Sequence, residues 1–287
     1  MTPSVPNTSI QVRNLSYNFA DGAVGLTDVS FDLPSGSRTL LIGAIGLQLF
    51  ANDPTPADIH NTANGAGKST LLRVLSGKRL APHGTVQIGG VDPFTTGLES
   101  VTYLGVEWVL NPIVHTDIDV PTLLASVGGD AYPDRRDQLI QILDIDLNWH
   151  MHAVSDGERR RVQLAMGLLR PWTLLLLDEI TMDLDLLSRS EFLGFLKRET
   201  EERECTIVYA THILDNLSRW PTHLVHMHLG RVIDWGPVEK FQVGRLASPS
   251  EDSRLGEVVL EWLKRDLRER GPRPGLPGEG KKIAVEF

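Results

Sequence analysis

The chain has 287 residues, a formal net charge of −9 and one cysteine, and 41% of its residues are apolar. That length and apolar content supply a core for one large domain or two small ones. The negative charge argues against broad binding to nucleic acid or anionic membranes. The lone Cys205 excludes an internal disulfide framework. Since no apolar stretch approaches the roughly 20 residues that span a bilayer and no signal peptide is visible, we expect a soluble intracellular protein.

The first third of the chain is expected to form strands around one helix. Alternating apolar residues predict strands over Ile10–Phe19 and Leu26–Leu33. The run Arg38–Ile42 is continuously apolar after its first residues, which is typical of a strand buried on both faces. Leucines at helical spacing predict a helix over Lys68–Leu80, and His83–Ile88 returns to a strand pattern.

The middle of the chain, about Thr95–Pro171, is expected to be mostly helical. Apolar residues recur every three or four positions in Tyr132–Ile145 and in Asp156–Leu169. A buried strand over Thr173–Leu177 and a helix over Leu187–Glu199 are expected next. The alternation of strands and helices therefore resumes after this region.

The last part of the chain continues that alternation. A buried strand is expected over Thr206–Ala210, a short helix over Ile213–Ser218 and a closing hairpin over His223–Trp235. Glu251–Arg270 has the pattern of a helix with one apolar side, and Gly271–Phe287 is rich in proline, glycine and lysine and is expected to be disordered. Strands alternating with helices predict an α/β fold with a largely parallel sheet.

A glycine-rich stretch before the first predicted helix predicts a phosphate-binding loop. It consists of Asn64, Gly65, Ala66, Gly67, Lys68, Ser69 and Thr70. Glycines let backbone N–H groups curl around phosphate oxygens, Lys68 would reach the β- and γ-phosphates, and Ser69 would bind Mg²⁺. A flexible glycine loop is the alternative, and the Gly-Lys-Ser-Thr run in this context disfavours it.

The phosphate loop is interrupted. The strict pattern needs a glycine five residues before Gly67, where Thr62 stands, and the glycine that fits is Gly43, at the end of the buried strand. Omitting the nineteen residues Ile45–Ala63 restores an unbroken loop. Two interpretations stay open: the segment is a short retained intron, or it is translated. A translated segment is expected to weaken ATP binding rather than abolish the fold, because closing such a loop costs roughly 2–3 kcal/mol.

Two acids follow the buried leucine strand. Asp178 is placed to bind Mg²⁺, directly or through water, and Glu179 to polarise the water that attacks the γ-phosphate. The alternative is a core strand that ends in two solvated acids. A phosphate loop about a hundred residues earlier favours the catalytic interpretation.

Together with Val-Ser-Asp-Gly-Glu at positions 154–158, these motifs resemble the ATP-binding-cassette (ABC) family. The family signature is Leu-Ser-Gly-Gly-Gln, which Ser155 and Gly157 match, whereas Asp156 and Glu158 depart from it. In the family this element binds the ATP that a second subunit holds. The resemblance covers about Ile10–Pro237 and implies a P-loop NTPase with a RecA-like parallel-sheet core, an antiparallel β subdomain and an α-helical signature subdomain.

The resemblance also implies the domain organisation. An ABC ATPase domain is expected over residues 1–245, with the extra segment at about 45–63 and the helical subdomain at about 105–170. Residues 246–270 are expected to form a C-terminal helix and 271–287 a disordered tail.

Four further residues correspond to family elements. Asp185 matches the loop that crosses the dimer interface, and His212 the histidine that contacts the γ-phosphate. Phe19 corresponds to the aromatic residue that stacks on adenine, with Tyr17 as second choice. The glutamine that links Mg²⁺ to the helical subdomain is missing, and Glu107 is its nearest counterpart as a magnesium contact.

Three stretches point to one branch of the family: Thr-Tyr-Leu-Gly-x-Glu-Trp at 102–108, Leu-Asp-Glu-x-Thr-x-Asp-Leu-Asp at 177–185 and Tyr-Ala-Thr-His-Ile at 209–213. With them the chain resembles a eukaryotic branch without membrane domains, whose fungal members are described as associated with the carbon-catabolite-repressor–NOT (CCR–NOT) complex. This implies a MgATP-hydrolysing homodimeric switch in transcription or mRNA regulation, in the cytoplasm and also the nucleus, without direct nucleic-acid binding. A transporter ATPase subunit with separate membrane subunits is one alternative, and a catalytically impaired adaptor is another.

His223, His226 and His228 lack an acidic or cysteine partner at metal-site spacing, so no metal is expected there.

Overall fold

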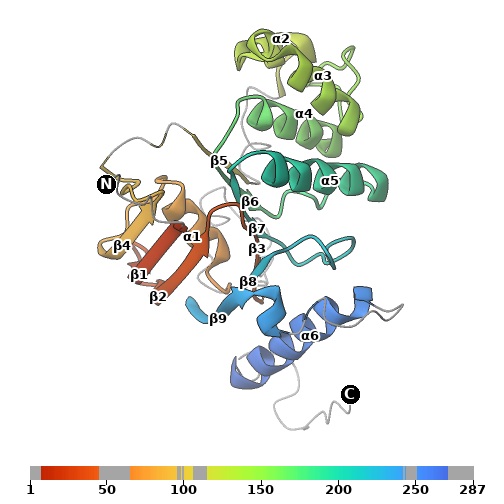
Figure 1. Ribbon diagram of the computed structural model, residues 1–287. Helices are drawn as coiled ribbons and strands as arrows, with labels where there is room; N and C mark the ends of the chain where they lie inside the picture. Colours follow the sequence, from red (N-terminus) through yellow and green to blue (C-terminus); the bar gives the residue numbers. More distant parts are fainter. Residues whose placement is uncertain are drawn as a thin grey trace, which may run out of the picture.

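The computed structural model describes residues 8–44, 65–95, 98, 100–105, 115–241, 243 and 251–270. Its strands form two sheets, which Figure 1 shows side by side. The smaller sheet is antiparallel and has the order β2-β1-β4. Its strands are β1 (Thr8–Asn18), β2 (Val24–Pro34) and β4 (His83–Ile88).

The larger sheet has the order β5-β6-β7-β3-β8-β9, and every neighbouring pair is parallel except β8 with β9. Its strands are β3 (Arg38–Ile42), β5 (Val101–Leu104), β6 (Leu174–Asp178), β7 (Thr206–Ala210), β8 (His223–His228) and β9 (Arg231–Pro237). Strands β3, β6 and β7 are buried along their whole length. The expectation of strands covered on both faces is therefore confirmed.

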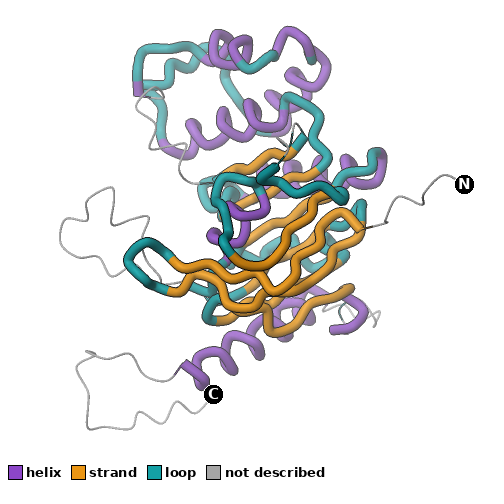
Figure 2. Tube along the Cα trace, turned by 90° about the vertical axis from the view of Figure 1, so that its left-hand side faces the viewer, coloured by secondary structure: helices purple, strands orange, loops and turns teal. Residues whose placement is uncertain are grey.

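Helices cover both faces of the larger sheet. The helix α1 (Lys68–Leu75) lies between the two sheets, and α4 (Asp156–Leu168) and α5 (Leu186–Glu202) lie on the opposite face. Short helices pack on α4 and extend the molecule away from the antiparallel sheet (Figures 1 and 2). These are α2 (Val120–Ser126), a 3₁₀ turn (Gly129–Ala131) and α3 (Pro133–Ile142).

The last described helix, α6, covers residues Glu251–Arg270 and lies at the other end of the molecule, beside β8. A 3₁₀ turn over Val238–Phe241 leads from β9 toward it. Trp262 on α6 stacks on His226 of β8, with ring centroids 4.6 Å apart. The apolar side that the sequence predicted for this helix is therefore the side that packs on the sheet.

Strand β6 shows how the larger sheet separates two hydrophobic cores. Leu174 and Leu176 pack with α1 and the antiparallel sheet, whereas Leu175 and Leu177 pack with the helices on the other face. Each leucine contributes about 1.5–3 kcal/mol when fully buried. The strand is thus held from both sides, and its C-terminal end is a rigid position for the acids that follow.

Two elements differ from what the sequence predicted: the helix α1 and the strand β5. The first helix ends at Leu75 rather than Leu80, because Gly77 adopts the left-handed conformation (φ 71°) that ends a helix. Val101–Leu104 forms strand β5 in a region expected to be helical. Its four residues give too short a pattern to identify a strand, and parallel pairing with β6 decides their conformation.

The expected helix over Ile213–Ser218 was also wrong. This stretch forms successive turns, and Asn216 has a φ of 62°, which an α-helix does not contain. The extra segment Ile45–Ala63 and the tail Gly271–Phe287 lie outside the described residues. In the part of the chain that the structure describes, no helix has the length and apolar character needed to cross a membrane.

Candidate nucleotide-binding site

The predicted phosphate loop lies between the end of β3 and the start of α1. Gly67 is the N-cap of α1 and has a φ of 92°, a conformation that favours glycine. A Cβ at Gly43 would lie 2.3 Å from the carbonyl oxygen of Met227 and 2.6 Å from the Cβ of Ala66, so no larger residue fits there. This close backbone approach supports Gly43 as the first glycine of the loop.

A backbone hydrogen bond joins the two sides of the extra segment. The Ala66 N–H donates to the Ala44 carbonyl (3.2 Å), and the Ala66 carbonyl accepts from the Gly230 N–H (3.2 Å). Without Ile45–Ala63, Ala44 and Ala66 would be three positions apart, and the same bond would close a β-turn. The backbone on the two sides of the segment is therefore already at turn distance.

Lys68 begins α1 and is 8% exposed. Its ammonium group donates a hydrogen bond to the Gly43 carbonyl (2.9 Å), which holds it against the loop. Burial lowers the pKa of Lys68, and the nearby carboxylates of Glu179 and Asp178 act in the opposite direction. A cation held among loop N–H groups can bind phosphate oxygens. Thr70 is buried in the same helical turn.

Ser69 and Asp178 form a pair of oxygen donors. The Ser69 hydroxyl donates to Asp178 Oδ1 (3.0 Å), and the Tyr103 hydroxyl donates to Asp178 Oδ2 (3.1 Å). Burial raises the pKa of Asp178, and the two hydrogen bonds oppose that effect. Adjacent oxygens around an octahedral magnesium ion lie about 2.9 Å apart, because Mg–O bonds measure about 2.0–2.1 Å. The Ser69–Asp178 separation fits that requirement.

Glu179 follows directly after β6 and contacts His212. The Nδ1 atom of His212 lies 2.8 Å from Glu179 Oε2, and the His212 backbone N–H donates to the same oxygen (3.3 Å). Burial raises the pKa of Glu179, while Lys68 and His212 lower it. Glu179 has a φ of 53°, a left-handed conformation that is strained for a non-glycine residue.

The two aromatic candidates for adenine stacking contact each other. The rings of Tyr17 and Phe19 meet edge to face, with centroids 5.3 Å apart, and the Arg79 guanidinium lies over both. A Cβ at Gly25 would lie 2.9 Å from the Phe19 ring, and the Gly25 carbonyl lies against Gly67. The aromatic pair is therefore next to the phosphate loop.

The predicted signature residues form a second group, at the start of α4. Ser155 is the N-cap of this helix: its Oγ accepts from the Glu158 N–H (3.3 Å), and Glu158 Oε2 accepts from the Ser155 N–H (2.7 Å). This reciprocal pair is a capping box. Capping of α4 therefore gives a structural explanation for a glutamate at position 158, where the family has glutamine. A Cβ at Gly157 would lie 3.2 Å from the Asp183 carbonyl.

Asp185 is the N-cap of α5 and connects that helix to α4. Its Oδ1 accepts from the Ser188 N–H (2.9 Å), and its Oδ2 accepts from the Arg161 guanidinium (2.5 Å). Asp185 therefore belongs to the signature group rather than to the group around Lys68. Two other predicted residues, Asn64 and Glu107, lie outside the described residues.

Tyr103 is a site residue that the sequence did not single out. It lies on β5, a strand that the sequence pattern did not predict within a mostly helical region, and parallel pairing places it opposite Leu176. A helical interpretation of this stretch gives no reason for its hydroxyl to reach Asp178. The only signal in the sequence was a tyrosine, with its polar hydroxyl, in the short stretch Val101–Leu104.

Comparisons with known proteins identify the family of this chain. A family model described as ABC transporter matches residues 63–182, so the match begins at the last residue of the extra segment. "CCR4-associated factor 16" of Saccharomyces cerevisiae is 40% identical, with 91% of this chain and 96% of the yeast protein covered. "ABC transporter I family member 20" of Arabidopsis thaliana is also 40% identical, with 93% of this chain and 79% of the plant protein covered.

Among solved structures, cbiO1 from Clostridium perfringens superimposes with a TM-score of 0.63, covering 89% of this chain and 98% of that chain. It is described as part of the ABC transporter complex cbiONQ, and its sequence identity to this chain is 21%. At that identity the likeness concerns the fold alone.

Proposed function

Because this chain belongs to the ATP-binding-cassette ATPases, we propose that its cassette binds MgATP at the site described above and, without the interrupting residues 45–63, hydrolyses it to ADP and phosphate. The fold is that of an ABC-type P-loop NTPase. The observation that carries the proposal is the convergence of one ammonium group and three oxygen donors at the ends of β3 and β6. These groups belong to Lys68, Ser69, Asp178 and Glu179.

In this mechanism Lys68 and the loop N–H groups bind the β- and γ-phosphates, and Ser69 and Asp178 hold Mg²⁺. The bound ion neutralises charge on the phosphates as the γ-phosphoryl group is transferred. Glu179 accepts a hydrogen bond from the attacking water and orients it, and its raised pKa makes it a stronger base. His212 holds Glu179 and donates toward the γ-phosphate.

The signature group completes the site from a second copy of the chain. Ser155 and Gly157 begin α4, whose N-terminal N–H groups suit a phosphate. Apolar side chains are exposed around Asp185, at Met182 (51%), Leu186 (65%) and Leu187 (72%). A homodimer with ATP between Lys68 of one copy and Ser155 of the other would cover that apolar surface.

One relative supports a proposal for the biological role. The yeast relative is named as a CCR4-associated factor. We extend that association to this chain: the dimer closes on MgATP and opens after hydrolysis, and the movement acts on a CCR–NOT-type regulatory complex in the cytoplasm and nucleus. The net charge of −9 favours a protein partner over direct contact with nucleic acid.

A transporter ATPase subunit is the second candidate, since the matched family model is described as ABC transporter and cbiO1 belongs to a transporter complex. Purification of the Glu179→Gln variant with bound ATP separates the two roles. Recovery of regulatory-complex subunits supports the switch, and recovery of a polytopic membrane protein supports the transporter.

The enzymatic proposal is tested by ATP hydrolysis with two chains, one complete and one lacking residues 45–63. We expect turnover only in the shortened chain, because the extra segment enters the loop beside the phosphates. Glu179→Gln in the shortened chain should abolish turnover and trap an ATP-bound dimer in gel filtration. Equal turnover of the two chains would refute the effect of the segment, and a Glu179→Gln protein that stays monomeric with ATP would contradict the dimer. If only the shortened chain hydrolyses ATP and residues 45–63 are present in the cell, the working protein is a catalytically impaired adaptor.

A further inference from the structure

Two segments of the helical region lie antiparallel, one before α2 and one before α4. Two backbone hydrogen bonds join them: Val120 N–H donates to the Trp149 carbonyl (3.2 Å), and Met151 N–H donates to the Ile118 carbonyl (2.9 Å). These four side chains turn inward and pack in the core of the helical region. Because side chains alternate along extended segments, the residues between and beside them must point outward.

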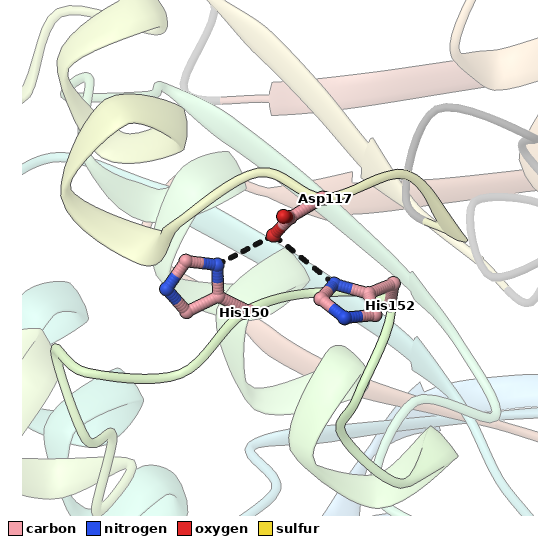
Figure 3. Close-up of side chains that lie close together, drawn as sticks. All are labelled: Asp117, His150 and His152. Carbon is pink, nitrogen blue, oxygen red and sulfur yellow. Dashed lines mark hydrogen bonds and ion pairs between the residues drawn. The ribbon is translucent and has the colours of Figure 1, made fainter.

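The outward side chains gather three potential metal ligands. Asp117, His150 and His152 are all exposed, and the buried Met151 lies between the two histidines. Asp117 Oδ1 lies 2.6 Å from Nδ1 of His150 and 3.2 Å from Nδ1 of His152. Figure 3 shows the two imidazole rings on either side of the carboxylate.

This cluster stands out within the described part of the chain. It is the one group there of three or more histidine, cysteine or acidic residues whose ligand atoms all lie within 4.8 Å of one another. The backbone hydrogen bonds, rather than the side chains themselves, hold the three residues on one surface. Preorganisation of this kind reduces the entropy that a bound ion must overcome.

We propose that Asp117, His150 and His152 bind a divalent transition metal ion, with zinc as the preferred ion. Imidazole nitrogen with one carboxylate suits zinc, whereas magnesium and calcium prefer oxygen ligands alone. Tetrahedral zinc, with bonds of about 2.0–2.1 Å, places its ligand atoms about 3.3–3.5 Å apart. The two histidine–aspartate separations, 2.6 and 3.2 Å, are each within about 1 Å of that spacing, and water completes the coordination.

The site is connected to the signature helix. The buried guanidinium of Arg159 donates to the Met151 carbonyl (3.0 Å) and to Asp156 Oδ1 (2.7 Å). His152 lies three residues before Ser155, the N-cap of α4. A bound ion therefore fixes the segment that leads into α4. Metal binding itself does not depend on the proposed ATPase activity.

The test uses the complete, untagged chain, stripped of metal with a chelator and kept free of magnesium and nucleotide. Titration with Zn²⁺ at pH 7.5 by calorimetry should give one ion per chain with a Kd below about 10 µM. His150→Gln and His152→Gln should each weaken that binding at least about tenfold. His83→Gln is the matched control: this histidine is exposed on β4, away from the cluster, and its loss should leave the affinity within about twofold.

Thermal unfolding supplies a second measurement, because a ligand that binds only the folded state raises the Tm. Zinc should raise the Tm of the parent chain and of His83→Gln, and should leave the Tm of the double variant His150→Gln/His152→Gln unchanged. Far-UV circular dichroism checks that each variant is folded, and His152→Gln serves alone if His150→Gln is not. The proposal is overturned if the parent binds no zinc in one-to-one stoichiometry, or if the double variant binds it equally tightly.

Discussion

The backbone hydrogen bond between Ala44 and Ala66 predicts what removal of the extra segment does to stability. In the complete chain 21 residues separate these two alanines, and without residues 45–63 only two would remain. The folded state must bring the two ends together in both cases. The deletion therefore lowers the entropy cost of folding without removing a contact among the described residues.

The magnitude follows from the loop lengths. Loop-closure entropy scales as (3/2)RT ln n, so shortening the loop from 21 residues to two should stabilise the protein by about 2 kcal/mol. At about 2–4 °C per kcal/mol, the Tm should rise by about 4–8 °C. Deleting only residues 48–60 leaves eight residues in the loop and should give about 0.9 kcal/mol.

Urea unfolding without nucleotide measures these differences. A third variant, in which a glycine–serine linker of equal length replaces residues 45–63, controls for composition and should match the complete chain within about 0.5 kcal/mol. An unfolding free energy that stays constant or falls in both deletions would refute the inference that the two ends are pinned together. If the linker variant is stabilised as much as the full deletion, length is not the cause.

Three other predictions each concern the replacement of one side chain. Tyr103→Phe removes a hydrogen bond to Asp178 and should raise the Mg²⁺ concentration for half-maximal ATPase activity by about threefold to tenfold in the shortened chain. Arg161→Ala removes the ion pairs with Asp185 and Asp144 and the hydrogen bond to the Leu143 carbonyl, so it should cost about 1–3 kcal/mol in urea unfolding and lower turnover at saturating MgATP. Burial lowers the pKa of His226, which faces an aspartate and an arginine of α6 and a histidine of β8. Below a pH of about 6.5 the unfolded chain therefore binds more protons at this histidine than the folded chain does. As the pH falls below that value, the unfolding free energy should decrease by up to about 1.4 kcal/mol per pH unit. His226→Gln should flatten that slope in urea titrations from pH of about 5 to 8.

The phosphate-loop and acidic residues could be predicted because their signals are local. Lys68 follows a glycine run at a helix start, and Asp178 and Glu179 follow a run of leucines. Each pattern fixes a backbone conformation over a few residues, and the chemistry depends on that conformation. The sequence favoured Phe19 for adenine stacking but kept Tyr17 as second choice. The structure places the two rings in contact, so it does not separate these candidates.

Other contacts depend on residues far apart in the chain. The sequence offered no acidic partner for His226 and His228, yet Asp266 lies 3.0 Å from His226, from a helix 40 residues later. Tyr103 reaches Asp178 only because β5 and β6 pair across about seventy positions. No short pattern of residues carries that information.

The cluster of Asp117, His150 and His152 depends on tertiary structure for the same reason. Asp117 lies 33 residues before His150, and neither segment has a strong strand or helix pattern of its own. Two backbone hydrogen bonds bring the segments together, and the buried Met151 decides which side chains face outward.

The sequence alone determined the order of most strands and helices, the strands that are buried on both faces and the loop chemistry, since periodic burial and glycine conformations are encoded by neighbouring residues. Only the tertiary structure decided which strand ends meet, how the two sides of the extra segment are joined, and which distant polar side chains share a surface. Those features depend on parallel pairing and long-range packing, whose partners are chosen by the whole core rather than by any local stretch.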